Sequence, residues 1–146
     1  MKPKRLFTVV VLALLVALVL TVPVSATGKL ATTLEARLTG EKEVPGPGDP
    51  NGVGHAVVKV FKAKVCYKLE VKRIKPANGA HIHLGFRGEA GPVVVPLRPP
   101  TDGFSRRCVG IPRAMSLELR EHPLRYYVNV HNKPFPEGAI RGQLHR

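Results

Sequence analysis

Glycines and prolines interrupt this sequence about every ten residues from Lys29 onward, and the short segments between them alternate apolar and polar side chains. Such segments predict β-strands, because successive side chains of a strand point to opposite faces. The pattern therefore predicts an all-β fold, an antiparallel, Greek-key-like β-sandwich of about eight strands. The expected strands are residues 30–38, 53–61, 64–74, 80–86, 92–97, 104–111, 125–130 and 139–144.

The segments between these strands predict turns, a loop and one helix. Residues 43–52, EVPGPGDPNG, predict a surface loop, because prolines lack a donor and fix φ while glycines favour turns. Residues 98–103, RPPTDG, predict a turn. Asn78-Gly79 suits the positive φ values of a type I′ turn, which predicts a hairpin between the third and fourth strands. Residues 113–123 predict a short helix ending at a proline, although their alternation also suits a strand.

The first 26 residues have the pattern of a secretory signal peptide. The basic MKPKR precedes an uncharged apolar run from Leu6 to Val22, and small residues at Val24 and Ala26 suit cleavage after Ala26. An uncleaved anchor is the alternative, because the apolar run approaches the roughly 20 residues that span a bilayer. Cleavage leaves residues 27–146 as one domain without a membrane span, in a secreted, periplasmic or cell-envelope protein.

The domain that remains is strongly basic. The chain has 23 lysines and arginines and 10 acidic residues, and the signal peptide takes three of the basic ones, which leaves 20 − 10 = +10. Such a charge favours anionic cell-envelope polymers as partners, while the scarcity of aromatic residues argues against a nucleic-acid platform. A surface that is merely kept soluble by like charge is the alternative.

Cys66 and Cys108 are the two cysteines of the chain, and both lie in the exported part. In an oxidising compartment such a pair normally forms one disulfide; free thiols or metal ligands are the alternative. The alternation of residues 64–74 places Tyr67, Leu69 and Val71 toward the core and Cys66 on the polar face. The predicted disulfide therefore needs either a bulge that shifts the register or a position at a sheet edge.

Two histidines, His81 and His83, stand one residue apart in the expected strand 80–86. Residues two apart in a strand point the same way, about 7 Å apart along the chain, so both imidazoles project from one face. In YYVNVHN the same parity places His131 on the face opposite the valines. If the two strands are neighbours, the three histidines converge.

Three imidazoles suit copper or zinc, which accept neutral ring nitrogens. His55, between glycine and alanine in GVGHAVV, is the candidate fourth ligand. His122 and His145 fall at the expected helix end and the chain terminus, where a surface position is expected. Hydrogen-bonding or surface histidines remain the alternative to a metal site.

The sequence indicates no catalytic residues. Ser25, Ser105 and Ser116 lie outside any nucleophile-elbow pattern, and nothing singles out an acid and a base among the ten acidic residues. The sequence therefore predicts no catalytic residue for hydrolysis.

Several blocks of the chain resemble the CHRD domain, a family named after chordin. They are EVPGPG, GHAVVKV, VCYKLEV, GAHIHLGFRGEAGPVVVPL, CVGI and YYVNVHNKPFPEGAIRGQL, in that order, over about residues 34–144. The resemblance implies an extracellular β-sandwich, found alone in secreted bacterial proteins and repeated in chordin beside growth-factor-binding modules. It implies a binding module, with an extracellular protein ligand as a further possible partner, and no established enzymatic activity. The family's marked residues fall on Cys66, Cys108, His81, His83, Gly91, Pro92, Asn129, His131, Pro136, Gly138, Arg141 and Gly142.

A weaker likeness connects the histidine pattern and the single disulfide with copper–zinc superoxide dismutases. Only a copper site could be assembled here, from His55, His81, His83 and His131, with Arg87 or Arg141 guiding the anion. The order and spacing of the ligands match poorly. The sequence thus predicts a binding module with a copper or zinc site, and a copper-only dismutase-like enzyme as the alternative.

Overall fold

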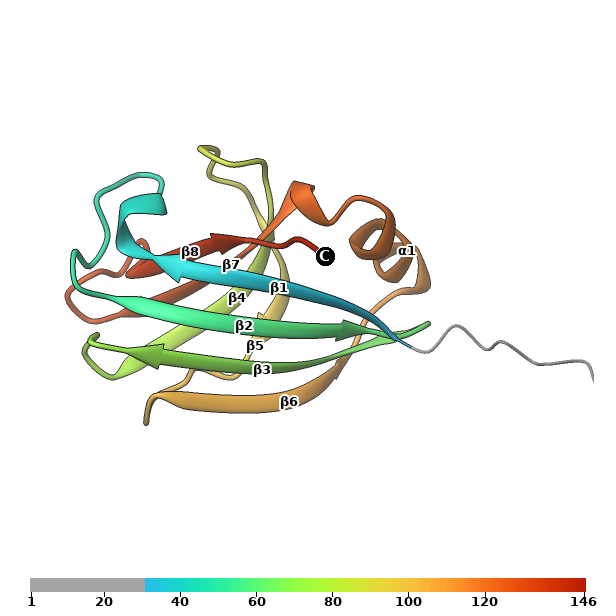
Figure 1. Cartoon of the computed structure of the whole chain (residues 1–146), viewed down its shortest axis with the longest axis horizontal. Coiled ribbons are helices and arrows are strands. Elements are labelled where there is room, and N and C mark those ends of the chain that lie inside the picture. Colours follow the sequence, from blue (N-terminus) through green and yellow to red (C-terminus); the bar gives the residue numbers. More distant parts are fainter. Residues whose placement is uncertain (1–30) are drawn as a thin grey trace, which may run out of the picture.

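The computed structural model describes residues 31–146, so the predicted signal peptide lies outside the described residues. Eight antiparallel strands form one sheet in the order β5-β4-β7-β8-β1-β2-β3-β6. Figure 1 shows β1, β2, β3 and β6 as one layer, with β4, β5 and β7 behind it. Their bounds are β1 Thr32–Thr39, β2 Val53–Val60, β3 Lys64–Lys72, β4 Ala77–Leu84, β5 Val93–Leu97, β6 Phe104–Gly110, β7 Tyr126–Asn132 and β8 Ile140–Gln143.

The core fills the space between the two layers. Side chains from both layers are buried there, including Leu34, Val58, Ile82 and Val128, each with no exposed surface. Non-consecutive strands are neighbours at three places, β3 beside β6, β4 beside β7 and β8 beside β1, so the chain crosses between layers as in a Greek key. The predicted antiparallel, all-β fold class is confirmed.

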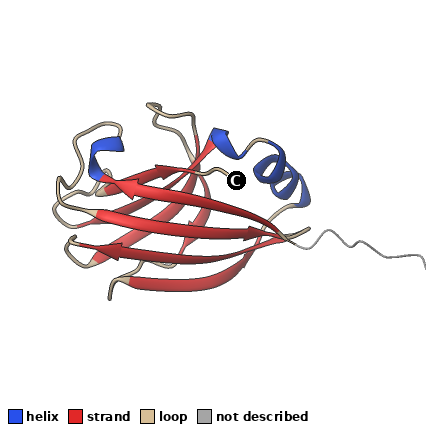
Figure 2. Ribbon diagram, viewed as in Figure 1, coloured by secondary structure: helices blue, strands red, loops and turns tan. Residues whose placement is uncertain are grey.

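The predicted helix is also confirmed. Helix α1 (Arg113–Glu121) covers one end of the sandwich, and a short 3₁₀ helix η2 (Pro123–Arg125) follows it (Figure 2). Leu119 is completely buried against the core, and the Ser116 hydroxyl donates to the Phe61 carbonyl at the end of β2. These contacts attach the helix to the sheet. Of the described part of the chain, no helix is long and apolar enough to cross a membrane.

The predicted hairpin at Asn78-Gly79 is wrong. Strand β3 pairs with β2 and β6, and both Asn78 and Gly79 lie inside β4. The glycine serves a close approach instead: a Cβ at Gly79 would lie 3.3 Å from Cδ2 of His131. The β4–β7 register also shifts between Ala77 and Gly79, as expected where glycine marks an irregularity inside a strand.

Cys66 and Cys108 form the predicted disulfide. They lie directly opposite each other on β3 and β6, and β6 is an edge strand of the sheet. Tyr67, Leu69 and Val71 are buried, so the register is unshifted and the sheet-edge alternative is the correct one. At a sequence separation of 42, the chain-entropy model gives the disulfide about 4 kcal/mol of stabilisation.

Candidate metal centre

Three histidines converge on the outer face of neighbouring strands β4 and β7. In the register of this pair, His81 lies opposite Asn129, His83 opposite Tyr127 and Gly79 opposite His131. Nδ1 of His81 is 3.2 Å from Nε2 of His131, and one ring nitrogen from each of the three histidines lies within 4.8 Å of the others. The predicted convergence of His81, His83 and His131 is therefore present.

Backbone carbonyls hold two of these rings in place. Nδ1 of His83 donates to the carbonyl of Gly91 at 2.8 Å, and Nδ1 of His131 donates to the carbonyl of Pro136 at 2.9 Å. These tautomers follow from the acceptors, because a carbonyl oxygen cannot donate. Each ring then presents an unprotonated Nε2, the arrangement in which a second hydrogen bond orients a metal-binding imidazole.

The remaining ring nitrogen of His83 has no hydrogen-bond partner. Its Nε2 is buried and unpaired among the described residues. A buried polar atom without a partner costs free energy, so its persistence at the centre of a histidine cluster indicates a place for a ligand. The donor set of three imidazole nitrogens fits copper or zinc, and three protein ligands leave one coordination position open.

Electrostatics favour the neutral rings that a metal requires. Burial lowers the pKa of His81, and the neighbouring His131 and His83 lower it further. Burial likewise lowers the pKa of His83, and His131 and Arg141 add to this, while the hydrogen bond to Gly91 opposes it. Neutral imidazole is the metal-binding form, so these shifts leave the two rings ready to coordinate without first losing a proton.

A stack of three side chains supports His83 from the sheet. The His83 and Tyr127 rings are parallel to within 13° with centroids 4.8 Å apart, and Cζ of Arg141 lies 3.4 Å from the Tyr127 centroid. Arg141 is only 2% exposed and donates from Nη2 to the carbonyl of Phe86. Tyr127 also accepts a hydrogen bond from the Gly91 amide through its hydroxyl. The sequence did not single out Tyr127 as a residue of the site. Its position opposite His83 in the β4–β7 register identifies it.

Glu43 is a second group that the sequence did not single out. The loop 43–52 is exposed at Gly46 as predicted, yet Glu43 itself is only 5% exposed. Asn129 donates to both carboxylate oxygens, at 2.9 and 2.7 Å. Burial raises the pKa of Glu43 to about 7, against the opposing effects of Arg141 and Asn129. A Cβ at Gly138 would lie 2.3 Å from Oε2, so this glycine leaves the space for the carboxylate.

The structure does not bring His55 to the cluster. His55 lies on β2, separated from β7 in the sheet by β8 and β1. Its Nε2 is 3.5 Å from Oε2 of Glu35, and its strand partners are Arg37 and Glu70. Within residues 31–146, the candidate metal-binding group consists of His81, His83 and His131 alone. His122 and His145 are exposed, as predicted.

Arg87 and Arg141, the two arginines that the sequence suggested for guiding an anion, lie in different environments. Arg141 is enclosed by Tyr127 and Phe86, whereas Arg87 is exposed. Together with Lys42 and Gln143 they line a cavity of about 20 Å³, the size of roughly one water molecule. Arg141 is therefore a buried part of the wall beside His83 rather than a free surface cation.

Comparison with known proteins assigns the family. The model of the CHRD domain matches residues 34–144 of the chain, which include all eight strands except the start of β1. No curated protein and no solved structure matches the chain. Because the family model covers most of the chain, including the three histidines and both cysteines, the chain belongs to the CHRD domain family.

Proposed function

We propose that this CHRD domain is an extracellular module that binds one copper or zinc ion through His81, His83 and His131. The supporting observation is the convergence of three ring nitrogens within 4.8 Å of one another. The carbonyls of Gly91 and Pro136 orient two of the rings, and Nε2 of His83 is buried without a partner. Hydrogen-bonding histidines without a metal would leave that nitrogen uncompensated.

The extracellular location rests on the disulfide and the family. A disulfide persists in oxidising compartments, and the predicted signal peptide would direct the chain there. An exported protein meets copper and zinc outside the cytosolic metal buffers. Neutral imidazoles suit both ions, so the natural choice between them depends on which is available in the compartment.

Metal analysis of the purified protein tests the proposal. After loading with Cu²⁺ or Zn²⁺ and dialysis, we expect one ion per chain in the unaltered protein. His83→Ala should lower the affinity at least about 100-fold, because it removes one of three ligands and leaves the other two on a single metal. His122→Ala, which removes an exposed histidine outside the cluster, is the matched control and should keep the full stoichiometry.

Two results would overturn the metal site. One is the absence of stoichiometric metal in the unaltered protein. The other is equal metal content in the His83→Ala and His122→Ala variants, which would place binding on surface histidines. Circular dichroism of each variant distinguishes loss of the site from loss of the fold.

A copper-only, dismutase-like activity is the second candidate, favoured by the coordination position that three ligands leave open. His55 lies outside the cluster and would not supply a fourth ligand. A superoxide assay of the copper-loaded protein separates the two candidates. Turnover that disappears in His83→Ala supports an enzyme, and a rate no higher than that of the variant supports a binding module.

A further inference from the structure

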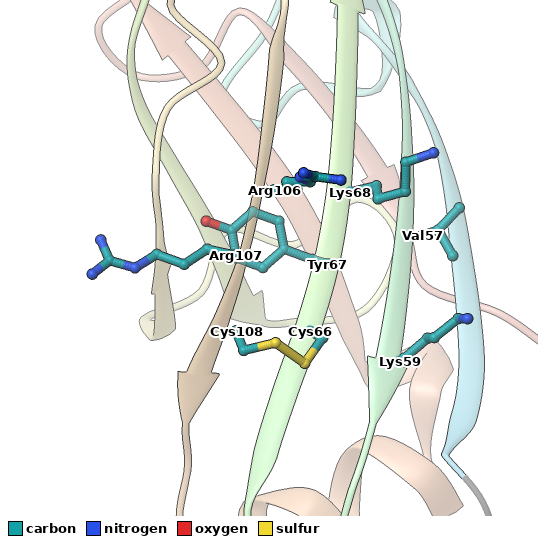
Figure 3. Close-up of a pocket in the computed structure, with 8 residues that line it drawn as sticks. All are labelled: Val57, Lys59, Cys66, Tyr67, Lys68, Arg106, Arg107 and Cys108. Atoms are coloured by element: carbon teal, nitrogen blue, oxygen red, sulfur yellow. A yellow bond between two sulfur atoms is a disulfide. The ribbon is translucent and has the colours of Figure 1, made fainter.

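A shallow basic groove lies on the outer face of β2, β3 and β6, away from the histidine cluster. It encloses about 420 Å³, a volume within the range of small-ligand sites. Figure 3 shows the disulfide joining β3 to β6 at one end of the groove, with the basic side chains spread over the neighbouring strands. The groove is lined by Val57, Lys59, Cys66, Tyr67, Lys68, Arg106, Arg107 and Cys108. We call this surface the disulfide groove.

Three cations of the disulfide groove share one face of the sheet. Lys68 lies directly opposite Arg106, and Lys59 lies opposite Cys66 in the next row. All three are exposed. Figure 3 shows Lys68 and Arg106 side by side, with Lys59 on the same side of the sheet, whereas Arg107 extends the opposite way. Strand spacing of about 4.8 Å brings neighbouring cations close enough to contact successive acidic groups of one ligand.

The cations of the groove are not paired with carboxylates in salt bridges among the described residues. No carboxylate of residues 31–146 lines the groove. Two acidic residues border the groove, Glu70 two residues from Lys68 on β3 and Glu35 opposite Val57 on β1, and both line a separate pocket around His55. Like charges placed together raise the free energy of the unliganded protein, and an anionic ligand relieves this repulsion.

The floor of the groove is apolar and rigid. The Cys66–Cys108 disulfide joins β3 to β6 on the same face as the cations, two residues along each strand from Lys68 and Arg106, and Val57 extends the apolar surface onto β2. An apolar floor with cations along it suits a sugar ring that carries an acidic group, because the C–H surface and the anion are both contacted. Tyr67 is only 3% exposed, and its hydroxyl accepts from the Arg98 amide. It offers no face for stacking a nucleobase.

We propose that the disulfide groove binds an acidic polysaccharide. The site is independent of the metal centre, since none of its residues touches the histidine cluster and its strands lie on the far side of β8 and β1 in the sheet. The net positive charge of the whole domain attracts the polymer over a distance, and the groove supplies the local contacts. Failure of either proposal therefore leaves the other intact.

The test compares two variants of equal charge on a heparin column, heparin serving as the sulfated polysaccharide probe. Lys68→Gln with Arg106→Gln removes two charges from the groove. Lys75→Gln with Arg113→Gln removes two exposed charges from elsewhere on the domain and is the matched control. We expect the groove variant to elute at clearly lower salt than the unaltered protein. The slope of the logarithm of the binding constant against the logarithm of the salt concentration should be smaller in magnitude by about two, because about one counterion is released for each charged contact. The control should elute close to the unaltered protein.

Equal weakening by both variants would overturn the proposal, because net charge alone would then explain retention. Retention that neither variant changes would overturn it as well. A competition experiment decides the class of ligand: soluble dextran sulfate should displace the protein from heparin at a lower charge concentration than a single-stranded oligonucleotide. If the oligonucleotide competes better, the groove is not a polysaccharide site. Thermal unfolding of both variants shows whether each remains folded.

Discussion

Gly91→Ala is expected to weaken copper or zinc binding about 10–100-fold, although residue 91 does not contact the metal in the proposed site. The Gly91 carbonyl holds Nδ1 of His83, and its amide donates to the hydroxyl of Tyr127. A Cβ on Gly91 would lie 1.6 Å from the carbonyl oxygen of Leu84, so the backbone must move. That movement releases His83 from the ring orientation that its hydrogen bond to Gly91 maintains. A metal titration measures the effect.

Gly88→Ala is the control for this prediction. Gly88 lies in the same loop and has a φ of 84°, which L-residues rarely adopt, but a Cβ there would meet nothing within 4 Å. This change should cost about 1 kcal/mol of folding stability through the backbone while leaving the metal affinity unchanged. Equal loss of metal affinity in both variants would show that the stability of the loop, and not the hydrogen bond from His83 to Gly91, determines the affinity.

The free energy of unfolding of Glu43→Gln, minus that of the unaltered protein, is expected to increase as the pH rises. The pKa of Glu43 is raised from 4.5 to about 7 in the folded protein. Between these pH values the unfolded chain has released the proton and the folded chain still holds it, so the free energy of unfolding falls as the pH increases. The Glu43 contribution is complete below pH 4.5 and lost above pH 7. At 1.36 kcal/mol for each pKa unit, the loss is about 3 kcal/mol.

Denaturant unfolding of both proteins at pH 4.5 and pH 8 measures this difference. Glutamine does not titrate, and its side-chain oxygen can still accept from Asn129. The histidines and other titratable groups are common to both proteins, so their effects cancel when one free energy of unfolding is subtracted from the other. The stability of Glu43→Gln minus that of the unaltered protein should rise by about 3 kcal/mol over this interval. A constant difference, or one that falls, would mean that Arg141 and Asn129 keep the carboxylate ionised despite its burial.

The sequence predicted most of this architecture because strand periodicity is a local property. All eight expected strands are present with small shifts at their ends, and the helix over residues 113–121 lies inside the expected range. Parity alone also placed His81 and His83 on one face and His131 on the matching face. Once β4 and β7 pair, this parity brings the three rings together without further requirements.

The errors concern which strands become neighbours. Asn78-Gly79 has good turn residues, but the glycine is needed where the His131 ring approaches β4. The chain bends before it, at residues 73–75, where Arg73 has a φ of 60°, and this bend connects two strands that do not pair. His55 has suitable glycine neighbours, but it lies on a strand that the sheet order keeps away from β7. Periodicity assigns a residue to a face of a strand and cannot assign the strand to its place in the sheet.

The buried groups beside the site could not be found from local pattern either. Glu43 lies in a loop of prolines and glycines, where an acidic residue is normally solvated, and it is buried because the loop folds back onto Asn129. Arg141 stands in a strand whose polar face would ordinarily be exposed, and it is covered by the segment at Phe86. Both depend on loops that cross the outer face of the sheet, and such contacts have no short-range signature.

Three histidines hold one metal ion in the proposed site, a claim that pulsed electron paramagnetic resonance of the Cu²⁺-loaded protein tests. The modulation from the remote ring nitrogens counts the coordinated imidazoles. The geometry predicts three imidazoles on one copper in the unaltered protein and in His122→Ala, and two at most in His83→Ala. A single imidazole in the unaltered protein, or a spectrum that His83→Ala leaves unchanged, would contradict the claim.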